Sequence, residues 1–171
     1  MRTKETTKTS SPICFMRIAI GLVYLWFGTL KFFPGLSPAE ELATDTISML
    51  TFHMIAPNLE LVLLAILEVV IGVFLILNIK TTTAIYMALF HIFFTFSPLF
   101  FFYDKSFNGN PIALTLVGQY IIKNLIIIGA LWVILKDVKT YGKSINIYPL
   151  GLFNKIFGNL TNVIFNTKQG R

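Results

Sequence analysis

Apolar residues in this chain gather in four long runs that are separated by short polar segments. The runs cover residues 13–33, 59–79, 82–102 and 112–135. Each is about 20 residues long, which at about 1.5 Å per residue lets a helix cross a hydrocarbon core about 30 Å thick. The pattern therefore predicts an all-α fold, a four-span transmembrane helix bundle.

Two weaker helical patterns lie outside these runs. Residues 37–40, with the sequence SPAE, match a capping box, and apolar positions then recur at roughly helical spacing. We expect a short amphipathic helix over residues 38–54 of the first outer loop, with an ordinary structured loop as the alternative. Apolar positions between 152 and 164 predict a C-terminal interfacial helix.

These patterns divide the chain into three parts. Residues 1–12 are rich in Thr, Ser and Lys and are expected to be a disordered cytoplasmic N-terminus. Residues 13–136 form the transmembrane domain, and residues 137–171 form a basic amphipathic cytoplasmic tail. A cleavable signal peptide is disfavoured, because no small-residue cleavage site follows the first run.

The charge balance fits a membrane protein. Only 13% of the 171 residues are charged and 55% are hydrophobic, whereas a soluble domain carries about 25% charged residues. The net charge of +6 comes from Lys and Arg near both ends and beside the runs, while the first outer loop holds Glu40, Glu41 and Asp45. This distribution predicts both termini in the cytoplasm and disfavours nucleic-acid binding.

Cysteine and histidine limit the cofactor chemistry. The single cysteine, Cys14, cannot form an internal disulfide and is expected to be a buried apolar residue. The two histidines, His53 and His91, fall in the outer loop and in mid-membrane, so they cannot both ligate one haem. No zinc-binding spacing is present. We therefore expect no covalently bound cofactor and no metal site.

Three ionisable residues fall near the middle of predicted spans: Glu68, His91 and Lys123. A charge in hydrocarbon costs a few kcal/mol, so it rarely occurs without a partner or a function. We predict that Glu68 pairs with Lys123 and that His91 joins them. Two interpretations stay open. The three residues neutralise one another and fix helix register, or they form a ligand or proton site.

Further polar residues surround this predicted centre. The other candidates for the polar centre are Gln119, Asn124 and Tyr24. Lys31 and Glu60 are expected to form an outer tier, where a lysine can snorkel and an acid suits a first helical turn. Arg17 is expected to anchor the first span by snorkelling to the cytoplasmic interface.

Three segments resemble one known family. RIAIGLVYLWFGTLKFF (residues 17–33), ILEVVIG (66–72) and GQYIIKNLIIIGA (118–130) resemble motifs of DoxX-like membrane proteins, and are most similar to the reactive-chlorine-resistance branch. The resemblance covers residues 13–136. It implies a multi-pass protein of the bacterial inner membrane, in a family named after a subunit of a terminal quinol oxidase or a thiosulfate:quinone oxidoreductase.

Three functions follow as hypotheses. The favoured one is a membrane accessory protein of a redox or redox-stress system that binds quinone at the polar centre, as a non-catalytic subunit rather than a stand-alone enzyme. The first alternative is a non-enzymatic membrane interaction or assembly protein. The second is a small transporter or proton conductor, which the lack of an inverted repeat disfavours. Expected partners are membrane lipid and a redox protein, and a homo-oligomer is left open.

Overall fold

The computed structural model describes residues 11–37 and 40–141, and these residues form helices and turns with no strand. The helices are α1 (Ser11–Leu30), α2 (Glu40–Leu50), α3 (Pro57–Leu77), α4 (Thr81–Thr95), α5 (Pro98–Phe101), α6 (Tyr103–Ser106) and α7 (Leu116–Tyr141). The all-α prediction is confirmed for this part of the chain. The predicted tail helix and residues 1–10 of the N-terminal segment 1–12, which was predicted to be disordered, lie outside the described residues. Ser11 and Pro12 of that segment belong to α1.

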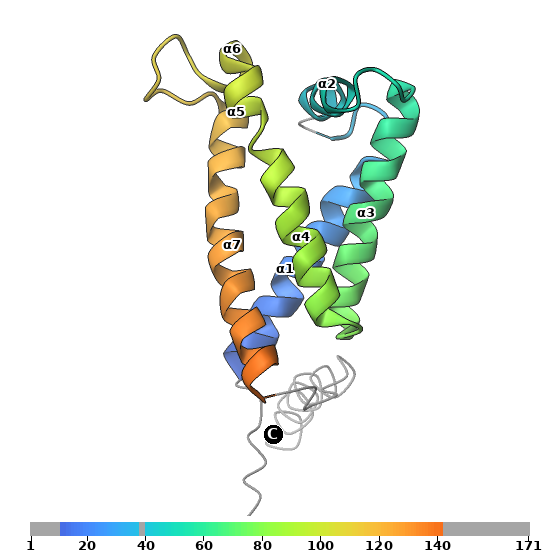
Figure 1. The fold of residues 1–171 in the computed structure, drawn as a ribbon, viewed down its shortest axis with the longest axis vertical. Helices are drawn as coiled ribbons and strands as arrows, with labels where there is room; N and C mark the ends of the chain where they lie inside the picture. Colours follow the sequence, from blue (N-terminus) through green and yellow to red (C-terminus); the bar gives the residue numbers. More distant parts are fainter. Residues whose placement is uncertain (1–10, 38–39, 142–171) are drawn as a thin grey trace, which may run out of the picture.

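α3 and α7 run roughly along the long axis of the molecule, and α1 and α4 cross obliquely between them (Figure 1). α1 packs most extensively on α3, while α4 contacts both α3 and α7. The short helices α2, α5 and α6 lie together at one end, which we call the α2 end (Figure 1). α1 begins and α7 finishes at the opposite end, which we call the terminal end.

Three helical stretches of the described chain are long and apolar enough to cross a membrane: Pro12–Leu30, Leu59–Leu77 and Thr81–Phe101. α7 spans 26 residues but carries Lys123, Lys136, Asp137 and Lys139. The apolar surface is large, since side chains such as Trp26, Phe90, Phe93 and Ile126 are exposed. Lipid is the solvent that suits such a surface.

Local sequence signals explain where the span helices begin and end. Pro57 opens α3, where its missing N–H costs nothing. Asn78 ends α3 in the left-handed conformation, which asparagine tolerates better than most residues. α4 ends shortly before Pro98, which cannot donate to the helical ladder. The predicted outer helix over 38–54 is shorter, at Glu40–Leu50.

Glycines let α1 and α3 approach closely. A Cβ at Gly72 would lie 2.7 Å from the Leu25 nitrogen, and one at Gly28 would lie 2.9 Å from the Glu68 Cβ. Only residues without side chains allow such contact. Because Gly28 meets Glu68, the last turn of α1 lies opposite the middle of α3. α1 is thus displaced along the axis toward the terminal end.

An apolar core fills the interior between the long helices. Its buried members come from four helices, and they are Ile20, Tyr24, Ile71, Leu75, Ala84, Ile85, Ala88, Ile92, Leu131, Ile134 and Leu135. Gln119 and Lys123, which were predicted to belong to the polar centre, are exposed on α7, while Ile121 and Leu131 are buried.

Candidate functional site

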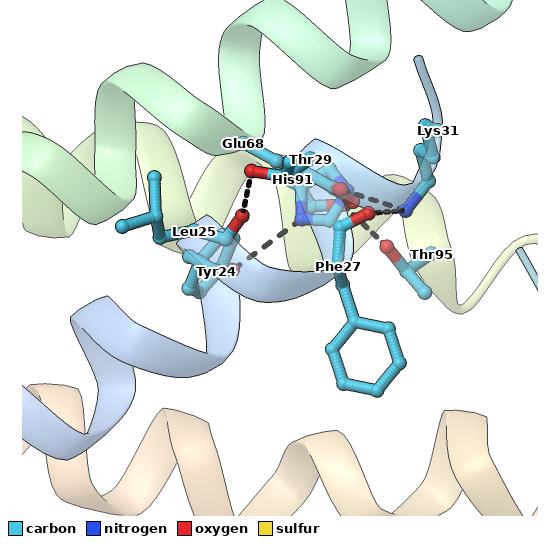
Figure 2. A network of polar contacts seen from close by, with 8 residues as sticks. All are labelled: Tyr24, Leu25, Phe27, Thr29, Lys31, Glu68, His91 and Thr95. Atoms are coloured by element: carbon cyan, nitrogen blue, oxygen red, sulfur yellow. Dashed lines mark hydrogen bonds and ion pairs between the residues drawn. The ribbon is translucent and has the colours of Figure 1, made fainter. Parts of the chain in front are cut away.

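A chain of polar contacts crosses the interior from α1 through α3 to α4 (Figure 2). Lys31 Nζ lies 2.6 Å from Glu68 Oε2, and His91 Nε2 lies 3.2 Å from Glu68 Oε1. The Tyr24 hydroxyl lies 3.3 Å from His91 Nδ1. We call Tyr24, Lys31, Glu68 and His91 the polar centre.

Hydrogen-bond donors and acceptors in the polar centre fit one neutral histidine tautomer. If His91 Nε2–H donates to Glu68, Nδ1 is left to accept from the Tyr24 hydroxyl. The Tyr24 and His91 rings also meet edge to face, with centroids 5.6 Å apart. Both side chains are therefore fixed in orientation as well as position.

The polar centre is buried but not uniformly so. The side chains of Lys31 and Glu68 are 9% and 7% exposed, and that of His91 is 16% exposed. Lys31 also donates to the Phe27 carbonyl at 3.5 Å. Of these three side chains, that of His91 is thus the most open to a molecule that approaches from the surrounding membrane.

Glu68 pairs with Lys31 and not with Lys123, so the predicted Glu68–Lys123 pair is wrong. Lys123 is exposed on α7, with its ammonium 4.8 Å from the centre of the Tyr120 ring. The position of Lys31 in the first run places it at the outer end of that span, away from Glu68, if α1 and α3 are level. The axial displacement of α1 brings Lys31 to the middle of α3, where it reaches Glu68.

Lys31 does not lie in the predicted outer tier, because it reaches Glu68 in the middle of α3. Glu60 does lie in the first turn of α3, as predicted, but it has a further role. Glu60 is 1% exposed, and its carboxylate accepts hydrogen bonds from the hydroxyls of Ser48 at 2.6 Å and Thr51 at 3.2 Å. Both hydroxyls belong to α2 and its C-terminal turn. Glu60 therefore attaches α2 to the first turn of α3, a role that the spacing of acids and lysines did not indicate.

The remaining candidates lie apart from the polar centre. Gln119 is exposed and donates to the Leu114 carbonyl at 3.4 Å, and Asn124 is half-buried on α7. Arg17 does not snorkel to the interface. It is buried and donates to the carbonyls of Leu75 and Ile76, at the last turn of α3.

One exposed ion cluster connects the short helices at the α2 end. Lys105 of α6 lies 2.6 Å from Asp45 and 2.7 Å from Glu41, both on α2. The hydrogen bonds to Asp45 and then to Glu41 raise the pKa of Lys105 above its ordinary value. No residue of this cluster was a candidate in the sequence analysis, because surface charges in loops give no signal of pairing.

The polar centre combines a cation, a carboxylate, an imidazole and a phenol in continuous contact. Such a set can hold a polar headgroup, and it can pass a proton along hydrogen bonds. Within the described residues, no three His, Cys, Asp or Glu side chains are grouped to hold a metal ion. His91 and Glu68 instead contact each other and the neighbouring Tyr24 and Lys31 side chains.

Comparison with known proteins identifies the family of this chain. Residues 13–104 match the DoxX family model, which is 92 of 171 residues and more than half of the chain. No curated protein and no solved structure matches the chain. The matched segment contains all four residues of the polar centre. With its apolar helices the chain is a multi-pass membrane protein, and it belongs to the DoxX family.

Proposed function

We propose that this chain is an accessory subunit of a membrane redox or redox-stress system, and that it binds a quinone at the polar centre. Family membership supports the accessory role in the membrane. The observation that supports quinone binding is the continuous series of contacts from Lys31 through Glu68 and His91 to Tyr24. Ionisable residues inside membrane spans mark ligand or proton sites by default.

The residues present suit a quinone headgroup. Its carbonyl oxygens need hydrogen-bond donors, and the Lys31 ammonium has three N–H groups, of which the structure uses two. The Tyr24 hydroxyl makes only long contacts, at 3.3 and 3.4 Å, so a closer carbonyl can replace them. The exposed apolar side chains nearby suit an isoprenoid tail.

A bound quinone supplies two-electron, two-proton redox chemistry. In this proposal the chain's own residues handle the protons: His91 holds one between Tyr24 and Glu68, and Lys31 balances the carboxylate charge. With a single cysteine, the chain has no dithiol to relay electrons. We assign electron transfer to a partner protein.

Tryptophan fluorescence tests the binding. The chain has two tryptophans, so Trp132→Phe leaves Trp26 on α1 as the only reporter. In nanodiscs, a short-chain quinone should quench Trp26 in a saturable way, and Glu68→Gln should weaken this binding at least about tenfold, or about 1.4 kcal/mol. Lys123→Gln is the control and should bind as the parent does, because Lys123 lies outside the polar centre. Equal binding by both variants would contradict the site.

The interaction or assembly protein remains the second candidate, and one observation favours it. Among the described residues, every buried side-chain nitrogen and oxygen has a hydrogen-bond partner. Each buried polar atom of the polar centre thus has at least one partner without a ligand, so fixing helix register is a sufficient role for these residues. Absence of saturable quenching in the parent, together with loss of folding in Glu68→Gln, would support this candidate.

We further propose four spans, with α7 as the fourth and both termini in the cytoplasm of a bacterial inner membrane. The basic residues near the ends of the chain support this orientation. Residues 118–130, on α7, support assignment to the reactive-chlorine-resistance branch by resemblance.

A further inference from the structure

Buried polar side chains are distributed unevenly along the long axis. Within the described residues, Arg17 and Thr81 lie at the terminal end. The others lie at the centre or toward the α2 end, and they are Lys31, Ser37, Thr46, Ser48, Glu60, Glu68 and Ser106. The two halves of the molecule therefore differ in the polar groups available to carry a proton.

An apolar layer separates the polar centre from the terminal end. It consists of fully or almost fully buried side chains from α1, α3, α4 and α7, which are Ile20, Ile71, Leu75, Ala84, Ile85, Leu131 and Ile134. Along α1 it fills the seven-residue interval between Arg17 and Tyr24, which is about 10 Å. None of these side chains can donate or accept a hydrogen bond, so none of them can carry a proton.

In the direction of the α2 end, the polar centre lies close to exposed loop residues. Lys31 directly follows the last residue of α1, and residues 32–36 after it are exposed. A single turn therefore separates the Lys31 end of the polar centre from the loops at the α2 end. Within the described residues, the hydroxyl of Tyr24, at the other extremity, contacts the Ala88 carbonyl and His91.

We propose that the polar centre exchanges protons with the aqueous phase at the α2 end alone, through Lys31 and Glu68, and that the apolar layer isolates it from the terminal end. This inference deepens the proposed function, since it assigns the side with which a quinone site would exchange protons. It also argues against the proton conductor, which requires a polar route through both halves.

The groups that face His91 are known from every neighbouring helix. α1 contributes Tyr24 and, beyond Glu68, Lys31, and α3 contributes Glu68. Within the described part of α7, no carboxylate lies within 4.0 Å of a His91 nitrogen. Arg17 bonds to the end of α3, on the far side of the apolar layer. Proton exchange at His91 therefore passes through Glu68.

The two histidines of the chain allow a direct test. His53→Asn leaves His91 as the only histidine, and asparagine tolerates the positive φ of 57° at that position. His91→Gln leaves His53, which is exposed in the loop at the α2 end and reports the pH there. Both proteins are prepared with isotope-labelled histidine in sealed vesicles. One phase is set to about pH 5.5 and the other to about pH 8, a range in which histidine titrates.

When the pH values of the two aqueous phases are exchanged, the nitrogen chemical shifts of His53 report the phase at the α2 end. We expect the nitrogen chemical shifts of His91 to respond to that same phase, in the same fraction of molecules. A His91 signal that follows the opposite phase, follows both phases or does not titrate would overturn the proposal. Proton flux into dye-loaded vesicles of the unmodified protein gives a second measurement, and it should equal that of protein-free vesicles. Flux well above that level would also overturn the proposal.

Failure of this proposal and failure of quinone binding can be told apart. One-sided titration of His91 without saturable quenching of Trp26 would leave the sidedness intact and reject the quinone. Saturable quenching that Glu68→Gln weakens, with titration from both sides, would keep the quinone and reject the sidedness.

Discussion

Glu68 has two partners of different chemistry, one on each carboxylate oxygen. Oε2 meets the Lys31 ammonium at 2.6 Å, and Oε1 meets the His91 imidazole at 3.2 Å. A carboxylate in this position depends on both, because its charge has almost no access to water. Removal of Lys31 alone therefore leaves a poorly compensated charge on Glu68, whereas removal of Lys31 and Glu68 together leaves no buried charge at either position.

Lys31 and Glu68 should show strong energetic coupling. Lys31→Met or Glu68→Leu alone should destabilise the protein by about 3–5 kcal/mol, and the double variant should lose less than the sum. Denaturant unfolding in mixed micelles measures the three free energies. Lys123→Met is the control and should shift the unfolding free energy by about 0.5 kcal/mol or less, since Lys123 is exposed. A coupling energy near zero would contradict the ion pair.

At the scale of helices, the contact between α1 and α3 depends on glycine. The backbones meet at Gly21, Gly28 and Gly72, where an added Cβ would approach other atoms to within 2.7–2.9 Å. This contact sets the axial displacement of α1, and the displacement in turn brings Lys31 to Glu68. The glycines are thus structural determinants of the polar centre, although none of them is part of it.

Alanine substitutions at two glycines should have opposite effects. Gly72→Ala places a Cβ 2.7 Å from the Leu25 nitrogen and should destabilise by about 1–3 kcal/mol, the usual cost of overpacking. Gly129→Ala has no atom within 4 Å of the new Cβ and should stabilise α7 by up to about 1 kcal/mol. Thermal unfolding of both variants in one detergent checks this, and equal effects would contradict the close approach.

The Lys105 cluster should respond to alkaline pH. Hydrogen bonds to Asp45 and then Glu41 raise the pKa of Lys105 above 10.5. A raised pKa means that the stabilisation is fully present below about 10.5 and is lost as the pH rises through the folded-state pKa. Unfolding curves collected across that range should show a loss in the parent protein that Lys105→Met lacks.

Lys136→Met is the matched control for that experiment. Lys136 lies over the Trp132 ring, 5.9 Å from its centre, rather than on a carboxylate. This variant should keep the alkaline loss of the parent. A loss that persists in Lys105→Met would assign the effect to another group.

For the whole molecule, the α2 end should face the outside of the cell. The motivation is the contrast between acidic residues in the first outer loop and basic residues near both termini. In a Cys14→Ala background, single cysteines at Asp45 and Asp104 should react with an impermeant maleimide added to intact cells, and one at Lys139 should not. All three positions are on the surface or partly exposed. Reaction at Lys139 alone would reverse the orientation.

The sequence allowed prediction of Tyr24, Glu68 and His91 as members of one polar centre, but not of the pairing of Glu68 with Lys31. Helical spacing relates four positions of α1, all of them buried: Gly21, Tyr24, Gly28 and Lys31. A sequence pattern can indicate such a shared face, because helical periodicity is a local property. The partner of Glu68 depends on how far α1 slides along α3. That displacement arises from glycine contacts between segments far apart in the chain, which no local pattern contains.

The reach of Arg17 bears on the order of events during synthesis. Its guanidinium binds the carbonyl of Leu75, 58 residues later in the chain, and that carbonyl does not yet exist when α1 leaves the ribosome. At about 5–20 residues per second, the wait lasts roughly 3–12 seconds. A buried arginine without its acceptors is costly in lipid. We therefore expect α1 to stay beside the insertion machinery until α3 arrives, and the two helices to enter the bilayer as a pair.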